Sequence, residues 1–525
     1  MSSTPDPVFL RRFINQHGGA RPIADSDWYG LVAAIVGSCA LIALTPPTRG
    51  WKLVRASILP LMMSYQAYFF LFPLEHDWET HWGNTTGHLW HLEKALELLL
   101  LYPAEEYWYR LRPAPVMAEL GNSADKEGEG KKGDMVAEPV PPPRTRAKLY
   151  WVLGAWFSQR GIGWNYTAPL PASSRRHPFT RQSGRIAFLL NRLRYLTAGY
   201  LCYDLARAYM TFGPGAAFFR GIPGIAPSHE TLTIPQRALY SVPIALRVFW
   251  SIEEWYTPIS IIAVALGGVL GWEGEWWSPW GWPPLFGTIR DLWIHPGLGH
   301  MWSKTWHQYF HHWLILFGWI GIGENILGLP ASGISVRPRL AASSFQSAPP
   351  SETSSPSTRS ASPSHPLPTA PTTSKRRTST KIMLSNFLKS LIVFALTGLH
   401  HDIPSYFLQL HTAPAGEPIT LAQTFSTTTF FLLQPLALAA EAFVKRNWRS
   451  WKDRAHPEWA KGEKEPKWLV TVERTIGFVW TWWWLGHTAR YFVVGLTKAG
   501  MYRHKPGQRE KFSPVGGFIY GQWWY

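Results

Sequence analysis

The chain has 525 residues, 46% of them hydrophobic, and a formal net charge of +17 at pH 7. Its mean hydropathy of −0.11 would suit a soluble protein, but long polar inserts between strongly apolar stretches lower that average. Two cysteines exclude a disulfide framework, and Lys and Arg beside the apolar stretches, as in residues 445–454, suit anionic lipid without requiring nucleic acid as a partner.

Residues 1–26 are polar, contain Arg11, Arg12 and Arg21, and lack the pattern of a cleavable signal peptide. The apolar stretch after them is therefore expected to be a retained signal anchor in the endoplasmic reticulum membrane. A helix needs about 20 mostly apolar residues to cross a bilayer. Stretches near that requirement lie at 28–44, 53–71, 195–219, 240–270, 306–327, 387–410, 424–444 and 475–496. They predict an all-α, polytopic transmembrane bundle of about eight spans, in which 240–270 could be one helix plus an interfacial piece.

Two polar segments interrupt this pattern. Residues 119–146 run through Lys, Glu, Gly and Pro and are predicted to be a flexible linker. Residues 331–380 are rich in Ser, Pro and Thr, a composition that buries too little apolar surface to offset its ordering entropy, so disorder is predicted there. The chain is thus expected to comprise N-terminal transmembrane segments (1–118) and a core in two parts (147–330 and 381–525).

Ionisable side chains are costly inside apolar stretches and usually face the protein interior or a water-filled cavity. Two clusters meet that description: residues 302–308, which include His307, and the sequence His400-His401-Asp402. An imidazole held away from water stays neutral, and a neutral imidazole can take a proton from an alcohol. Adjacent histidines beside a carboxylate therefore favour a functional site over packing.

The pattern Thr397-Gly398-Leu399-His400-His401 resembles the histidine motif of the membrane-bound O-acyltransferases, with Thr where Ser is usual. Further blocks resemble the wax-synthase-like branch of that superfamily, and one loop resembles a loop of its fungal members. These are WPPLFG at 282–287 followed by Arg290, MWSKTWHQ at 301–308, FFLLQP at 430–435, R-x-x-G-x-x-W at 474–480, and the loop RGIGWN at 160–165. Their order and spacing carry the resemblance.

The resemblance implies one-step acyl transfer. Aligning Thr397 with the usual Ser makes His401 the base that deprotonates a substrate hydroxyl, whose oxygen then attacks the thioester carbonyl of acyl-CoA. A shift of one residue would give that role to His400. His307, or Gln308 beside it, would donate a hydrogen bond to the developing oxyanion.

The implied substrates are an acyl-CoA donor, long-chain or acetyl, and a lipophilic alcohol, either a fatty alcohol or a terpenoid or other secondary-metabolite hydroxyl. Lys304 and Arg290 could hold the phosphates of CoA, although positive-inside topology explains them equally well. Trp306, Gln308 and Asp402 complete the predicted substrate-binding set. Membrane lipid is the expected surrounding partner. Neither a metal ion nor a cofactor is expected, since acyl-CoA is a cosubstrate.

Two other classes of protein fit parts of the pattern. His307, His311 and His312 have the spacing of a histidine box in membrane di-iron desaturases and hydroxylases, and neutral imidazole suits iron. No histidine precedes His400 at the spacing that a second such box requires. A transporter or membrane scaffold is the other alternative, although the chain shows no internal symmetry of the kind many transporters have.

Overall fold

The computed structural model describes residues 26–72, 78–113, 135–166, 179, 183–220, 232–331, 380–412, 419–460, 463–498, 500–501 and 511–524. This part of the chain is built from helices, which confirms the all-α prediction, with one small antiparallel sheet of β1 (Leu111–Pro113) and β2 (Met135–Ala137). The polar N-terminus, most of the predicted linker and almost all of the Ser/Pro/Thr-rich insert lie outside the described residues.

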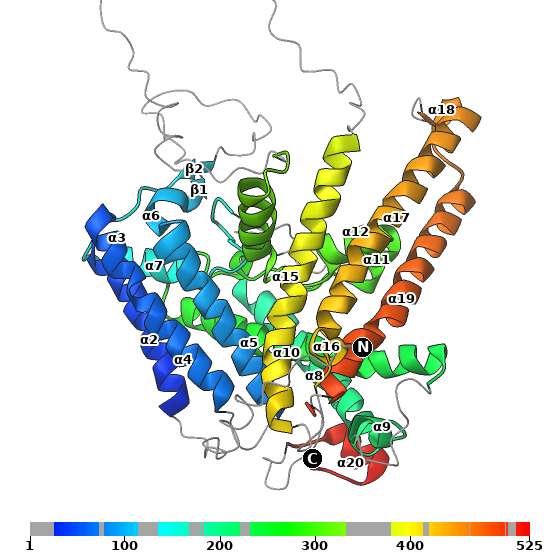
Figure 1. Cartoon of the computed structure of the whole chain (residues 1–525), viewed down its shortest axis with the longest axis horizontal. Coiled ribbons are helices and arrows are strands. Elements are labelled where there is room, and N and C mark those ends of the chain that lie inside the picture. The colour runs from blue at the N-terminus through cyan, green and yellow to red at the C-terminus, as the bar shows by residue number, and fades with distance from the viewer. Residues whose placement is uncertain are drawn as a thin grey trace, which may run out of the picture.

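The first helices form a group at one side of the molecule, drawn from dark blue to cyan in Figure 1. They are α2 (Ser26–Leu44), α3 (Arg49–Ala56), α4 (Ile58–Leu71), α5 (Trp78–Ala95), its π-helical continuation η1 (Leu96–Leu101), α6 (Ala104–Tyr107) and α7 (Arg146–Phe157). Buried Trp108, Trp151, Trp156 and Trp164 fill the core beneath them. At one end Glu105 binds both Arg55 and Lys148 at 2.8 and 3.1 Å, which ties α3, α6 and α7 together.

Long helices form the rest of the bundle. α8 (Arg185–Thr211) packs on α10 (Ile234–Val269), and α15 (Thr380–Thr412) packs on α17 (Ser426–Ala455), on α19 (Lys467–Lys498) and on the π-helical η5 (Leu314–Ile326). α15 stands between the N-terminal group and the pair α17–α19 (Figure 1). Stretch 240–270 lies in one helix, α10, which continues through Pro243 and Pro258.

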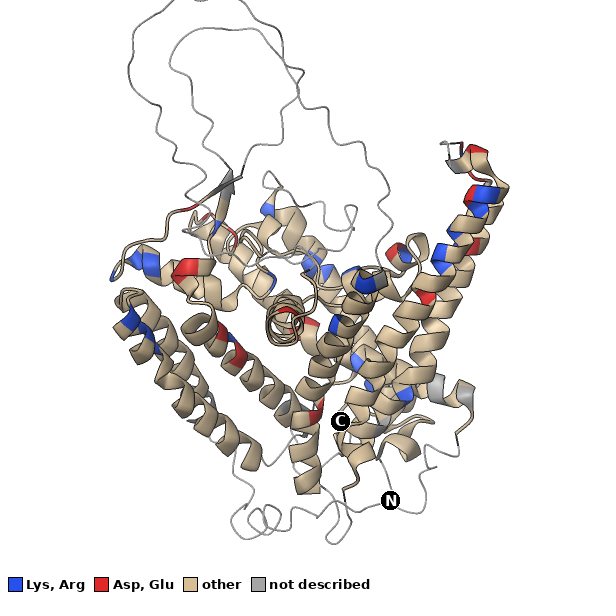
Figure 2. Cartoon of the chain, turned by 45° about the horizontal axis from the view of Figure 1, so that its top comes forward, with Lys and Arg blue, Asp and Glu red and all other residues tan. Residues whose placement is uncertain are grey.

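Short elements connect these helices. They are α9 (Ala216–Arg220), η3 (Pro279–Gly281), α11 (Ile289–Ile294), α12 (Leu298–His300), η4 (Met301–Thr305), α13 (His311–Trp313), α16 (Leu421–Thr424), α18 (Pro457–Ala460) and α20 (Pro514–Tyr520). α17 and α19 project beyond the bundle and are joined at their free ends by α18, where Figure 2 shows Lys and Arg together with Asp and Glu. Lys452 and Arg454 lie in the last turn of α17.

Among the described residues, two helices are long and apolar enough to cross a bilayer: 381–412 in α15 and Ser426–Ala455 in α17. The other predicted stretches are also largely helical, but crossing by these helices stays a prediction. Buried charges such as Asp204 in α8 and Glu253 in α10 lower the hydropathy of those two helices. Large apolar side chains are nevertheless exposed on the outside of the bundle, as Leu61 and Ile476 are, and such a surface suits lipid.

Candidate active site

The two predicted histidine clusters meet inside the bundle. His400 and His401 lie on α15, and His307 lies in the turn between η4 and α13. The ring centroid of Phe310 is 5.7 Å from that of His307, 4.8 Å from that of His400 and 6.4 Å from that of His401. Three imidazoles from two distant segments therefore share one aromatic neighbour.

His401 is held by its own helix. Its Nδ1 lies 2.7 Å from the carbonyl oxygen of Thr397, one turn earlier. A carbonyl only accepts hydrogen bonds, so Nδ1 carries the hydrogen and Nε2 keeps its lone pair. Nε2 forms no hydrogen bond within the described residues, and the side chain is partly exposed. This nitrogen is therefore free to accept a proton from a bound molecule.

Aromatic rings from several elements surround His401. Trp82 of α5, Phe431 of α17 and Phe492 of α19 have centroids 5.9, 5.4 and 6.0 Å from the imidazole. The indole Nε1 of Trp82 donates to Ser405 at 3.0 Å, which fixes that ring against α15. Such surroundings are apolar and poor in water, and electrostatic interactions there are stronger than in solvent.

His400 faces a different helix. Its Nδ1 donates to the Glu93 carboxylate of α5 at 2.9 Å, and the imidazole is buried. Sequence analysis missed Glu93, because α5 is not among the predicted apolar stretches and spacing along the chain does not reveal a contact between helices. Neighbouring positions of a helix point about 100° apart, so His400 and His401 serve different surroundings.

Asp402, predicted to bind substrate, holds the start of α17. Its two carboxylate oxygens accept hydrogen bonds from the backbone nitrogens of Thr427 and Thr428 at 3.0 and 2.7 Å. A carboxylate at this end of a helix satisfies unpaired N–H groups and interacts favourably with the helix dipole. The structure thus gives Asp402 a role in joining α15 to α17, which the sequence did not predict.

The turn that carries His307 is held by its neighbours. The side-chain amide of Gln308 donates to the carbonyls of Trp302 and Trp306 at 3.0 and 2.8 Å, so it is already engaged by the backbone. The rings of Trp306 and Phe286 lie 5.4 and 5.7 Å from the ring of His307. Nδ1 of His307 is buried and has no hydrogen-bond partner in the described structure, an exception to the usual pairing of buried polar atoms.

The predicted phosphate-binding residues lie near the surface. Lys304, in η4, is partly exposed and Arg290, in α11, is exposed. Neither forms an ion pair within the described residues. Burial lowers the pKa of His300, and the nearby His295, Lys304 and Lys445 lower it further by their positive charge. The negative charge of Asp291 in α11 opposes this effect, so charged side chains of both signs lie near His300.

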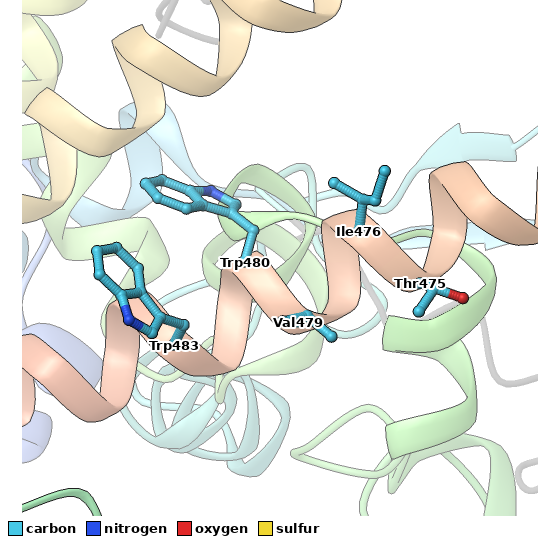
Figure 3. A pocket seen from close by; sticks show the side chains of 5 residues that line it. All are labelled: Thr475, Ile476, Val479, Trp480 and Trp483. Carbon is cyan, nitrogen blue, oxygen red and sulfur yellow. The ribbon is translucent and has the colours of Figure 1, made fainter. Parts of the chain in front are cut away.

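The structure also has an open groove of about 400 Å³ on the outside of α19. Figure 3 shows the lining side chains: Thr475, Ile476, Val479, Trp480 and Trp483. The groove is lined by no acidic or basic side chain. The side chains of Ile476, Val479 and Trp483 are more than half exposed on the outside of the bundle. We interpret it as part of the apolar outer surface.

Of the residues of the di-iron hypothesis, His312 is engaged by another part of the chain. Its Nε2 lies 2.9 Å from the carboxylate of Glu97 in η1. Within the described parts of the chain, no three side chains of His, Cys, Asp or Glu form a group that could hold a metal ion.

Comparison with known proteins gives similarity to fungal transferases. The chain is 25% identical over 302 residues to O-Mevalon transferase yanI of Aspergillus niger, covering 56% of this chain and 53% of that protein. It is 24% identical over 343 residues to acetyltransferase ataH of Aspergillus terreus, covering 63% and 83%. It is 26% identical over 168 residues to acetyltransferase sirH of Emericella nidulans, covering 31% and 34%.

The chain spans about half the length of O-Mevalon transferase yanI, at 53%, and about a third of acetyltransferase sirH, at 34%. No family model matches the chain, and no solved structure matches it. The comparisons therefore link the chain distantly to fungal proteins named as acetyltransferases and to one named as an O-mevalon transferase.

Proposed function

We propose that the chain is a membrane-bound O-acyltransferase of the wax-synthase-like kind, which moves an acyl group from acyl-CoA to a lipophilic alcohol. One observation carries the proposal: His401 and His307, from distant segments, lie around Phe310, and Nε2 of His401 has no hydrogen-bond partner among the described residues. The similarity to fungal acetyltransferases supports acetyl-CoA as one of the donors.

In the proposed reaction Nε2 of His401 takes the proton of the hydroxyl as the alcohol oxygen attacks the thioester carbonyl. The tetrahedral intermediate then collapses, the C–S bond breaks, and Nε2 gives the proton to the departing sulfur, so that CoA leaves as the thiol and the imidazole is neutral again. Thr397 keeps the imidazole in the required tautomer through Nδ1. A ring N–H of His307 donates to the oxyanion, and one such donor contributes about 3 kcal/mol.

The choice of His401 over His400 rests on their partners. His400 is buried and paired with Glu93, whereas His401 is partly exposed and faces rings that suit a lipophilic acceptor. Gln308 supports the turn through the two carbonyls that it binds, so His307 rather than Gln308 is the oxyanion donor.

The two substrates have separate surroundings in this proposal. Trp82, Phe431 and Phe492 contact the alcohol, and Trp306 beside His307 contacts the acyl group. Lys304 and Arg290, on the adjacent elements η4 and α11, attract the phosphates of CoA from the aqueous side. Helices other than α15 and α17 also cross or enter the membrane, which is expected to be that of the endoplasmic reticulum. The acceptor alcohol then reaches the site from the lipid.

Acyl transfer by microsomes that express the chain tests this function. Radiolabelled acetyl-CoA and palmitoyl-CoA are offered with fatty-alcohol and terpenol acceptors. We expect ester formation to fall about 10²- to 10⁴-fold in His401→Ala at equal protein level, the usual contribution of a general base. No ester from any pairing, with iron bound to the purified protein, would instead favour the di-iron hypothesis.

A further inference from the structure

Arg160 is a buried arginine in the loop after α7, and it holds a segment distant from it in sequence. Its Nη1 donates to the carbonyl of Pro283 at 2.8 Å and its Nη2 to the carbonyl of Pro284 at 3.1 Å. The hydroxyl of Tyr256, from α10, donates to the same Pro283 oxygen at 2.6 Å. A guanidinium presents its donors in a fixed fork, so it fixes the direction of both carbonyls at once.

Arg192 of α8 extends this arrangement by one residue, because its Nη2 donates to the carbonyl of Trp282. Three consecutive carbonyls are thus held by side chains from the α7 loop, α8 and α10. Proline has a fixed φ and no N–H, so the segment 282–284 cannot be held through the amides of its prolines. Side-chain donors set its position instead.

The far end of the same segment touches the turn that carries His307. The ring of Phe286 lies edge-on to those of His307 and Trp306, at 5.7 and 5.3 Å. The backbone nitrogen of Gly287 donates to the carbonyl of Thr305 at 2.8 Å. A Cβ at Gly287 would lie 2.9 Å from the Cα of Thr305, so the two backbones are in close contact.

We propose that Arg160 is a positioning residue for His307, which it orients through the segment 282–287. The inference rests on the proposed function for the role of His307 in the reaction. Because Nδ1 of His307 has no hydrogen-bond partner among the described residues, ring packing restrains the imidazole where that bond would otherwise do so. A displacement of Phe286 therefore changes the direction in which the His307 N–H points.

The first test is a double-mutant cycle in the acyl-transfer assay. Arg160→Gln is expected to lower kcat about 10- to 100-fold with little change in the KM for acyl-CoA, since misplacement by about 1 Å can cost that much. Arg160→Lys, which keeps the charge but loses the fork, is expected to recover part of the rate. In a His307→Ala background, Arg160→Gln is expected to lower kcat by less than about a further twofold, because the imidazole that Arg160 positions is already absent.

Arg55→Gln is the matched control. Arg55 is equally buried, but it binds Glu105 at the far end of the N-terminal group. Any loss that it causes through general destabilisation should be the same in both backgrounds. The inference would be overturned if Arg160→Gln kept the wild-type kcat. It would also be overturned if Arg160→Gln lowered kcat by the same factor with and without His307→Ala, as is expected of Arg55→Gln.

A chemical readout separates this inference from the proposed function. Diethyl pyrocarbonate labels accessible imidazoles, and mass spectrometry reports the rate for each histidine. Arg160→Gln should change the labelling rate of His307 and leave that of His456, at the end of α17, unchanged. A wild-type chain without transferase activity would remove the proposed function, yet equal labelling of His307 in both proteins would remove the role of Arg160.

Discussion

His400 and His401 are neighbours in sequence but have different partners in the structure. The His400–Glu93 pair is buried, with side chains 3% and 14% exposed, whereas His401 contacts Thr397 and aromatic rings. Removal of one partner of such a buried hydrogen-bonded pair leaves the other without compensation. In the proposed reaction His400 therefore belongs to the framework of the site, and His401 to its chemistry.

His400→Ala is expected to lower the free energy of unfolding by about 3 kcal/mol, because Glu93 then stays buried without its partner. Transfer should fall less than about tenfold, or roughly 1.4 kcal/mol in barrier. Thermal melts in detergent and the ester assay measure the two effects. Adding Glu93→Gln should recover part of the stability. A stable but inactive His400→Ala would give the role of base to His400.

The sequence was sufficient to predict that the histidines lie at a site, but not to identify their partners. A small-Gly-Leu-x-His pattern in an apolar stretch singles out His400 and His401 without any structure. Glu93 and Arg160 contact segments that are distant in sequence, and periodicity along one helix contains no information about such contacts. Asp402 was selected for its position beside the histidines, yet its hydrogen bonds depend on where α17 begins.

Among the elements, the junction of α15 and α17 depends on one glycine. A Cβ at Gly398, one turn before Asp402, would clash with the backbone Cα of Thr428 in the first turn of α17. A backbone atom cannot rotate away as a side chain can. The two helices can therefore approach closely only if this position stays glycine.

Gly398→Ala is expected to cost about 1–3 kcal/mol of stability through overpacking, and to reduce ester formation because His401 shifts with α15. Gly87→Ala in α5 is the matched control, since nothing lies within 4 Å of a Cβ placed there. That substitution should be neutral or gain up to about 1 kcal/mol, as alanine favours a helix. Melting temperatures of both variants decide the matter, and equal effects would contradict this account.

The boundaries of elements were harder to predict than their existence. Stretch 240–270, expected to be one helix or a helix plus an interfacial piece, is part of a single α10 that contains Pro243 and Pro258. Conversely, stretch 53–71 is divided at Ser57 into α3 and α4. Packing against α8 supports α10 across its prolines, and such tertiary support is not visible in the sequence.

For the whole molecule, the N-terminal group is joined at one end by the cluster of Glu105, Arg55 and Lys148. Burial alone would raise the pKa of Glu105, but the hydrogen bond from Arg55 and the charges of both cations bring that pKa below its usual value. The folded state therefore holds the charged form more strongly than the unfolded chain does. This contribution to stability is complete above the unfolded pKa and is lost as the pH falls through the folded one.

Acid is thus expected to loosen α3, α6 and α7 as the pH falls below about 4.3, the usual pKa of a glutamic acid. Hydrogen exchange of these helices in detergent, measured between pH 3 and pH 7, tests the expectation. Glu105→Gln should exchange faster at pH 7 and lose most of the dependence on acid. Protection that stays constant from pH 7 to pH 3 in the wild type would contradict it.

At this scale the composition predicted a helical protein with apolar stretches, and the described residues agree. The number of membrane crossings stays a prediction: hydropathy identifies two such helices among the described residues, and α8 and α10 contain buried charged residues that lower their averages. Glu253, for example, accepts hydrogen bonds from Thr257 and Tyr195 inside the bundle. A linear average treats such residues as exposed.

The hydrogen bond between His401 and Thr397 determines how the proton travels in the proposed reaction. Since the hydrogen of Nδ1 stays in the hydrogen bond to the Thr397 carbonyl, a proton can enter and leave the ring at Nε2 alone. The proton taken from the alcohol and the proton given to the thiolate then pass through one atom. No exchange of tautomer separates one turnover from the next, and the imidazole is ready for a new alcohol as soon as the thiol departs.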